Sequence, residues 1–375
     1  SRPSHHTGRF IQVNVDIKPK EIRALFPTDI FFQTTYWGLV KSHLGWEPAA
    51  FDFTSSTGLQ GDVMILVKAL TGDFTAAYVP QGPESGPDPE KYGLFLESLS
   101  QELIRYMDST VVFIRYDLPW VSPYAVDTAD GIAWHGHPPL KLRELRMNIG
   151  TRTWPLRKAP IDLTVADALV IDLVRTEEAI FNAMKPKTRY NIRVAKRKGV
   201  SVFNASLEML PLFYKLYLQT AKRNGFLPGS YRHFAALFSP GYHNPGSSQI
   251  LFLLAARGKD ILAGAIIAVS GKQAIYLYGA SSNEQRNLMG SYALHWEAIK
   301  LARAMGCLTY DMGSISPASD QDHPFYGMYR FKTGFGGTII HRNGTWDYLV
   351  NRHRYRAFRN YETSFNITLP KSYPQ

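Results

Sequence analysis

The sequence contains a single cysteine among its 375 residues. One thiol cannot form an intramolecular disulfide, and it cannot supply the paired cysteine ligands of a zinc cluster. Because Cys307 stands in an apolar context (AMGCLTY), we interpret it as a buried thiol.

Long apolar runs are also missing. A helix that spans a bilayer needs roughly 18 consecutive apolar residues, and the longest candidate here, Ile261 to Val269, indicates a buried strand. The opening SRPSHHTGRF lacks the apolar core of a signal peptide and does not start with methionine. We therefore expect a cytoplasmic protein, which could still visit the inner face of the plasma membrane.

The motifs of several enzyme classes are missing too. Neither a P-loop nor a Gly-x-Ser-x-Gly nucleophile elbow occurs. His135 and His137 could start a metal site, but no third ligand is near them in the sequence, so we expect no metal. No cofactor is expected either.

The bulk composition favours a folded protein with an anionic partner. Hydrophobic residues make up 45% and aromatic residues 13%, which is ample for real cores. A chain of this length predicts two domains of about 150 residues each. The formal net charge of +11 favours nucleic acid, a nucleotide or anionic lipid as partner.

The most basic stretch, Met184 to Val200, has no acidic residue. Pro186 separates two short helical segments, and Gly199 closes the second. Two readings stay open, a solvated helix face and a cradle for a polyanion. Its cationic residues are Lys185, Lys187, Arg189, Arg193, Lys196, Arg197 and Lys198.

The predicted elements repeat their order along the chain. In each half, strands and helices alternate in a similar sequence, which predicts two similar α/β domains. The clearest expected helices are residues 91–107, 208–224 and 287–305, and the clearest expected strands are residues 61–69, 75–79, 111–116, 249–256, 260–269 and 273–278.

Five segments in order resemble the Fem-type peptidoglycan bridge-forming aminoacyltransferases. In one of them, FIRYDLP, a leucine separates the aspartate from the proline, unlike the family pattern. The segments are FFQTTYWGLVK with GWEP, YVPQGP, FIRYDLP, DLVRTEE with KPKTRYNIRVAKRKGV, and YDMGSI with GMYRFKTGFGG.

The resemblance implies two GNAT-like domains with mixed sheets flanked by helices. The implied boundaries are residues 1–165 and 166–341, with the tail 342–375 returning to the first domain. Residues 238–249 leave no room for the long helical arm of some members, so the chain is similar to the compact ones.

The implied activity is amide formation. An aminoacyl ester on tRNA would be attacked by the side-chain amine of the stem peptide's third residue in a UDP-linked or lipid-linked muropeptide precursor. Two polyanionic partners would also account for the excess of positive charge.

Lys332 and Asp117 are the candidate catalytic residues. Lys332 precedes Gly334, Gly336 and Gly337, and the resemblance assigns it to oxyanion or tRNA-end contacts; a surface lysine beside a β-bulge is the alternative. Asp117, expected at the end of a strand, is a candidate general base. A strand-end aspartate that caps a turn is the more common situation, and proton transfer by the substrate itself is an alternative.

The remaining candidate residues contact substrates. By the resemblance, Phe331 would pack against the terminal adenosine of the tRNA, and Lys187, Arg189 and Arg193 would bind its phosphates. Lys41, Trp37 and Tyr278 would bind the acceptor, and Tyr276 would share a strand face with Tyr278. The arginine expected for the acceptor's diphosphate is out of register, so Tyr231 and Arg232 are candidates for that contact.

Two other functions fit the sequence. An acyl-CoA-dependent N-acyltransferase would use a glycine-rich turn for the pyrophosphate, but residues 285–292 offer one glycine. A non-catalytic protein that binds RNA or an anionic membrane would explain the charge, including the aromatic and cationic tail at residues 351–359.

Overall fold

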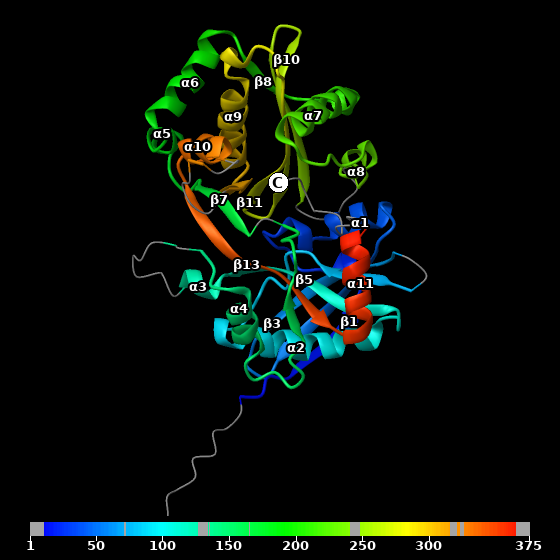
Figure 1. Cartoon of the computed structure of the whole chain (residues 1–375). Helices are drawn as coiled ribbons and strands as arrows, with labels where there is room; N and C mark the ends of the chain where they lie inside the picture. Colours follow the sequence, from blue (N-terminus) through cyan, green and yellow to red (C-terminus); the bar gives the residue numbers. More distant parts are fainter. Residues whose placement is uncertain are drawn as a thin grey trace, which may run out of the picture.

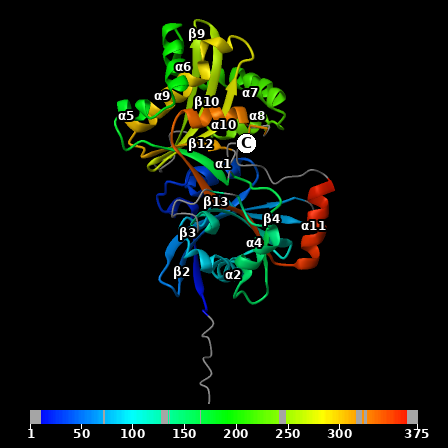
Figure 2. The same cartoon turned by 60° about the vertical axis from the view of Figure 1, so that its left-hand side comes forward.

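The computed structural model describes residues 11–70, 73–126, 134, 136–164, 166–240, 248–315, 321–322 and 326–364. Figure 1 shows two lobes, one above the other. The first lobe contains β1–β6, α1–α4 and α11, and the second contains β7–β12 and α5–α10; strand β13 runs through both (Figure 2).

The strands within the described residues form one continuous mixed sheet in the order β1-β2-β3-β4-β5-β13-β7-β12-β11-β10-β9-β8, and β6 pairs with β13. Their bounds are β1 Val15–Lys20, β2 Glu47–Ser55, β3 Gln60–Ala69, β4 Thr75–Val79, β5 Val111–Val121, β6 Leu156–Lys158, β7 Asp167–Asp172, β8 Ser201–Asn204, β9 Gln249–Arg257, β10 Asp260–Ser270, β11 Gln273–Ser281, β12 Thr309–Ser314 and β13 Thr338–Leu349.

The helices flank both faces of this sheet. Their bounds are α1 Thr35–His43, α2 Tyr92–Leu103, α3 Pro123–Val126, α4 Leu140–Asn148, α5 Glu177–Asn182, α6 Pro186–Arg197, α7 Leu210–Asn224, α8 Tyr231–Ala236, α9 Gly290–Ala304, α10 Tyr326–Gly334 and α11 Arg352–Ser364. The predicted fold class, α/β with mixed sheets flanked by helices, is confirmed. The domain boundaries stay predictions, and so does the GNAT-like character of each half.

Strand alternation divides the first lobe into two cores. Val63 and Ile65 of β3 face the apolar stripe of α2, whereas Met64 and Leu66 face α1 on the other side. The second core continues into the second lobe, because the same buried cluster includes Phe213 of α7 and further residues of α8 and β10. The two lobes therefore share apolar packing.

Strand β13 joins the lobes by hydrogen bonding to both. Its first half, Thr338 to His341, pairs with β7, and its second half, Arg342 to Leu349, pairs with β5. The pairing with β13 also extends β5 beyond the expected end at residue 116, so Asp117 lies inside the strand opposite Thr345. The expectation of a strand-end aspartate is therefore wrong. Pro119 is accommodated where the register shifts between Arg342 and Gly344.

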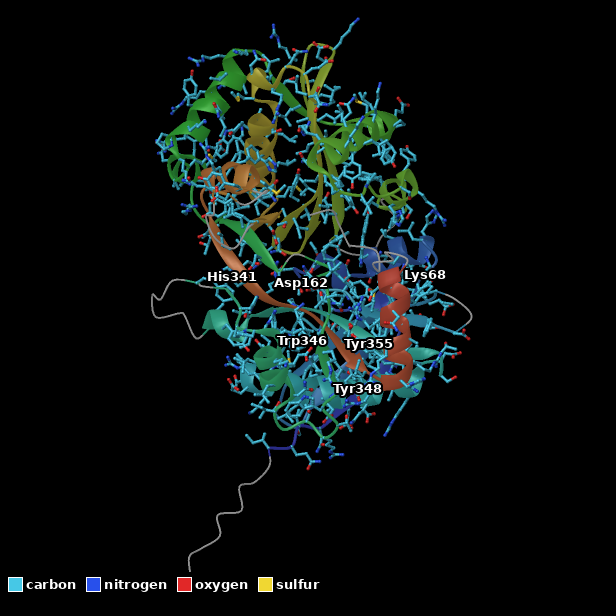
Figure 3. All side chains as sticks on the ribbon, in the orientation of Figure 1. Lys68, Asp162, His341, Trp346, Tyr348 and Tyr355 are labelled. Carbon is cyan, nitrogen blue, oxygen red and sulfur yellow. The ribbon has the colours of Figure 1, made fainter. Side chains whose placement is uncertain are left out.

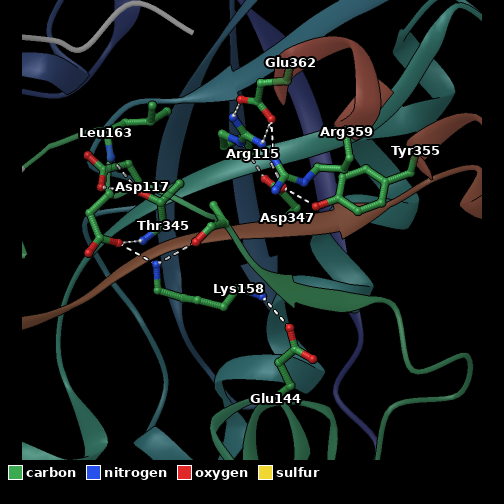
Figure 4. Close-up of polar contacts among 12 residues, drawn as sticks. Arg115, Asp117, Glu144, Lys158, Leu163, Thr345, Asp347, Tyr355, Arg359 and Glu362 are labelled. Atoms are coloured by element: carbon green, nitrogen blue, oxygen red, sulfur yellow. Dashed lines mark hydrogen bonds and ion pairs between the residues drawn. The ribbon is translucent and has the colours of Figure 1, made fainter. Parts of the chain in front are cut away.

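The C-terminal helix α11 is held by a buried charge network (Figure 4). The Arg115 guanidinium on β5 donates Nε–H and Nη2–H to the two Asp347 oxygens at 2.7 and 2.9 Å, and Nη1–H to Glu362 at 2.8 Å. Tyr355 donates its hydroxyl to Asp347, and Phe358 packs against Phe113. All members of this ion-pair network are buried, so each charge depends on its partner.

Among the described residues, no helix combines the length and the apolar character that crossing a bilayer requires.

We expect Arg115→Met to lower the free energy of unfolding by about 3–5 kcal/mol, because Asp347 would stay buried without a counter-charge and Glu362 would keep only its pair with Arg359. Urea unfolding followed by circular dichroism measures the change. Arg105→Met is the control, since Arg105 is 71% exposed in its pair with Glu102, and it should change the value by less than about 0.5 kcal/mol. Equal unfolding midpoints for the two variants would contradict the role of the network.

Candidate active site

A cavity of about 1180 Å³ opens in the second lobe between β11, β12, α7, α9 and α10. Its wall combines aromatic rings, glycine backbone and a few ionisable groups, which is typical of a ligand site. The residues that matter most below are His233, Tyr278, His295, Gly313, Phe331 and Lys332.

Lys332 is on α10, and the glycines that follow it end that helix. Gly336 and Gly337 have positive φ angles of 84° and 90°, as the sequence predicted for close backbone approach. The Lys332 ammonium donates to the Ser314 carbonyl and is 7% exposed. Burial lowers the pKa of Lys332 to about 8, and the negative charge of Asp311 opposes the shift. Because Lys332 is buried, the alternative interpretation of it as a surface lysine is wrong.

Phe331 and His295 flank this lysine. Phe331 packs edge-on against Tyr292, His295 and Phe335 at ring-centroid distances of 4.9, 5.6 and 5.3 Å. His295, which the sequence analysis missed, is within 3.0 Å of the Tyr310 hydroxyl. Burial and the Lys332 charge lower the pKa of His295 to about 3, so its imidazole is neutral at physiological pH. The signal for His295 in the sequence was a polar residue on the buried face of the helix expected at residues 287–305.

Tyr276 and Tyr278 lie on opposite faces of β11, so the expectation that they share a face is wrong. The register shifts between Ile266 and Ile267 of β10 because Leu277 of β11 is an extra, unpaired residue, and the two tyrosines therefore pair with successive residues. Tyr278 packs against Phe234 at 4.6 Å, and Tyr276 packs against His295 at 4.7 Å. Both still line the cavity.

Lys41 lies on α1 in an aromatic setting. Its Nζ is 5.0 Å from the Trp37 ring centroid and 5.6 Å from that of Trp46, and the residue is 3% exposed. The described residues offer this ammonium no hydrogen-bond acceptor or carboxylate, and the Trp37 indole N–H also lacks an acceptor among them. Burial, helped by the Lys68 charge, lowers the pKa of Lys41 to about 8. Such a group favours an incoming anion.

Three further basic residues surround Lys41. Lys68 on β3 lies near the boundary of the lobes (Figure 3), and its ammonium donates to Leu44 O at 3.3 Å. Arg232 reaches across from α8 and donates to His43 O at 3.3 Å. Burial and then the charges of Lys41, Lys68 and Arg232 lower the pKa of His233. We call these four residues the cation cluster.

Sequence reasoning had found two members of the cation cluster and missed Lys68 and His233. Lys68 ends an apolar strand and His233 follows Arg232, but nothing in the sequence around them indicates that these residues lie near α1. Tyr231, the other candidate here, is 40% exposed and packs edge-on against Tyr214 at 5.5 Å.

One residue of the cation cluster lies in the wall of the cavity. His233 lines the same cavity as Lys332, whereas Lys41, Lys68 and Arg232 are not among its lining residues. The cavity therefore meets the cation cluster at His233.

Asp117 is not among the residues that line this cavity. It is 1% exposed, and its carboxylate accepts hydrogen bonds from the hydroxyls of Thr164 and Thr345. Burial raises the pKa of Asp117 to about 6, and the two hydrogen bonds oppose the shift. The role of general base stays a prediction.

The basic stretch, Met184 to Val200, forms the turn after α5 and the helix α6. Lys187 and Arg193 are exposed on α6, and the Arg193 guanidinium lies 5.1 Å from the Phe181 ring. The Arg189 guanidinium instead donates to the carbonyls of Asn182 and Met184. Arg189 thus supports the end of α5, while the other two are open to a ligand.

Among the described residues, no group of three or more His, Cys, Asp or Glu is arranged to hold a metal. His137 lies within them and His135 lies outside.

A family model supplies the decisive comparison: the model described as the FemAB family matches residues 25–240 and 252–363. The chain belongs to the FemAB family. The expected Fem-type aminoacyltransferase of peptidoglycan synthesis is therefore confirmed at the level of the family.

Individual relatives of this FemAB-family chain are distant. A lipid II:glycine glycyltransferase of Staphylococcus epidermidis is 23% identical over 88% of this chain and 90% of its own length. One of Staphylococcus saprophyticus is 23% identical, but the match covers 51% of this chain and 60% of the relative. A crystal structure of FemX superposes with a TM-score of 0.69 at 18% identity and covers 90% of this chain and 96% of that one. The latter similarity shows the shared fold.

We expect inorganic pyrophosphate to bind the cation cluster and to bind more weakly as the pH rises through about 8, because Lys41 must be protonated to attract it. Above that pH the dissociation constant should rise up to about tenfold per pH unit. Isothermal titration calorimetry between pH 6.5 and 9.5 measures it. Lys41→Met should abolish binding, whereas Lys141→Met, an exposed lysine of α4, should not. Pyrophosphate binding unaffected by Lys41→Met would contradict the assignment.

Proposed function

We propose that the protein transfers an amino acid from aminoacyl-tRNA to the side-chain amine at the third stem-peptide residue of a muropeptide precursor. The observation that carries this proposal is the single cavity lined by Lys332 at one side and by His233 of the cation cluster at another. A ligand that contacts His233 and a ligand that contacts Lys332 can then lie in one cavity.

The reaction needs positioning and charge stabilisation more than a nucleophilic side chain. The precursor's amine nitrogen attacks the ester carbonyl carbon, the new C–N bond forms, and the C–O bond to the tRNA ribose breaks. The proton lost by the amine goes to the departing ribose oxygen. The Lys332 ammonium is suited to stabilise the oxyanion, because it lines the cavity and burial strengthens its field.

The proton carrier is a separate choice within this proposal. His295 is neutral, but its low pKa, about 3, makes it a poor base. Asp117, with a pKa of about 6, has the better proton affinity but lies outside the cavity wall. Direct transfer through the substrate fits the cavity best, and Asp117 is the alternative.

The acceptor's diphosphate would bind the cation cluster. Lys41 supplies a buried charge without a counter-ion, and Lys68 and Arg232 supply further positive charge. The names of the staphylococcal relatives favour a lipid-linked acceptor and glycine as the transferred residue. A UDP-linked precursor carries the same diphosphate, so it is the second acceptor to test. A lipid-linked acceptor would bring the enzyme to the inner leaflet of the plasma membrane.

An acyl-CoA-dependent acyltransferase is favoured by one observation. The N-terminus of α9 opens on the cavity at Gly290 and Ser291, and Met289 before it has a φ of 59°, so backbone N–H groups are available to a phosphate. The 3′ end of a tRNA offers phosphates as well. Acetyl-CoA as donor therefore belongs in the same assay.

We expect label from a charged tRNA pool to enter the precursor, and Lys332→Ala to slow transfer by about 100- to 1000-fold, the cost of losing one oxyanion donor. Radiolabelled amino acids with lipid-linked and UDP-linked precursors in parallel measure it. Lys259→Ala, an exposed lysine in the turn between β9 and β10, should transfer at the wild-type rate. Transfer from acetyl-CoA but not from tRNA would replace the proposal by its alternative.

We expect exposed residues of α6 to bind tRNA phosphates. Lys187→Gln combined with Arg193→Gln should weaken tRNA binding and reduce the slope of log K against log salt by about 1.5, the value for two lost contacts. Filter binding at several salt concentrations measures it. Lys18→Gln with Lys141→Gln, both exposed in the first lobe, is the control. Equal slopes for the two double variants would show that α6 is only a solvated helix face.

A further inference from the structure

Arg342 lies where β13 passes from one lobe to the other. Its backbone N–H donates to Ala166 O at 2.8 Å, and it is paired with Val121 of β5. Its guanidinium donates to Asp311 Oδ2 at 3.1 Å, and the Asp311 side chain has no exposed surface. Strand β13, which pairs with strands of both lobes, therefore holds the buried Asp311 carboxylate of the second lobe in place.

Asp311 in turn holds an irregular piece of backbone. Its Oδ1 accepts from the Gly313 N–H at 2.7 Å. The pairing of β12 with β7 loses register between Asp311 and Ser314, and Gly313 has a φ of 78°, a conformation that favours glycine. The carboxylate thus stabilises a bulge at the end of β12 that opens on the cavity.

The bulge is what holds Lys332. The Ser314 carbonyl, next to Gly313, accepts from the Lys332 ammonium. A Cβ built on Gly313 would lie 4.0 Å from Lys332 Nζ, so the ammonium also faces the glycine backbone. A continuous chain of contacts leads from Arg342 through Asp311 and the bulge to Lys332.

We propose that Arg342 and Asp311 are positioning residues for the Lys332 ammonium. They fix the Ser314 carbonyl to which the ammonium is anchored, and the charge of Asp311 favours its protonated form. This inference rests on the proposed role of Lys332 in transfer. Figure 3 shows the neighbouring residue His341 at the junction of the lobes, where this chain of contacts begins.

The same arginine connects Lys332 to the first lobe. The positive charge of Arg342 lowers the pKa of Asp117, against the larger effect of burial. Arg342 therefore binds the carboxylate beside Lys332 in the second lobe and acts electrostatically on Asp117 in the first. Replacing Arg342 should therefore disturb the position of Lys332 without removing a side chain from the cavity wall.

The titration of Lys332 can be followed without substrates, because its other ionisable neighbours stay neutral around pH 8. His295 has a pKa of about 3, and burial raises the pKa of Tyr276 and Tyr310 above the ordinary range. The ¹³Cε resonance of Lys332 in lysine-labelled protein, assigned with Lys332→Ala, reports its protonation directly.

We expect Asp311→Asn to move the Lys332 titration to a lower pH, because a favourable negative charge is lost while the amide oxygen still accepts from Gly313. Arg342→Gln should not lower it, because Asp311 keeps its negative charge. Both variants should reduce kcat for transfer by at least about tenfold and change KM for either substrate less than threefold. Arg342→Lys should restore most of the rate.

Arg303→Gln, an exposed arginine of α9, should behave as the wild type in every measurement. Melting curves check that all variants are folded at the assay temperature. An active wild type with unchanged kcat in Asp311→Asn and Arg342→Gln would overturn the inference. So would a lower kcat with an unmoved Lys332 titration in Asp311→Asn, which would indicate a purely structural role. A wild type that transfers nothing refutes the proposed function instead, and the titration alone then decides whether Asp311 controls Lys332.

Discussion

The hydrogen bonding of β13 to two strands that are far apart in the chain is the constraint on which the structure depends. One half of the strand completes the sheet of the first lobe through β5, and the other half completes that of the second through β7. Because β13 forms these hydrogen bonds with both lobes, it fixes the position of one lobe relative to the other. The cavity is bounded in part by His233 of α8, and its neighbour Arg232 reaches α1 of the other lobe.

Two lysines show what burial does to an ammonium group. Lys332 and Lys41 are both almost fully enclosed, and burial lowers the pKa of each to about 8. Lys332 retains a carbonyl and a nearby carboxylate, and both favour its protonated form. Lys41 has neither among the described residues, so the cost of its charge falls when an anion arrives. The first arrangement suits a group that acts on a reacting atom, and the second suits a group that binds.

Local patterns in the sequence predicted the helices and most strand ends well, but they ended β5 and β11 too early. The apolar spacing of residues 91–107 anticipated α2, because a helix closes its hydrogen bonds within a few residues. The true extent of β5 depends on β13, which lies more than 200 residues later, and the faces of β11 depend on a bulge beside β10. Lys41 and Lys332 were found through family-like segments, whereas Lys68 and His233 join them only by tertiary contact.

The buried Arg115 network has a consequence for how the chain is made. Arg115 binds Asp347 and Glu362, residues separated from it by 232 and 247 positions. During synthesis the first lobe therefore emerges with an uncompensated guanidinium at its centre, and it waits for the entire second lobe before that charge is neutralised. Contacts of such long range close slowly. The N-terminal half thus reaches its final fold after, or together with, the half that is synthesised later.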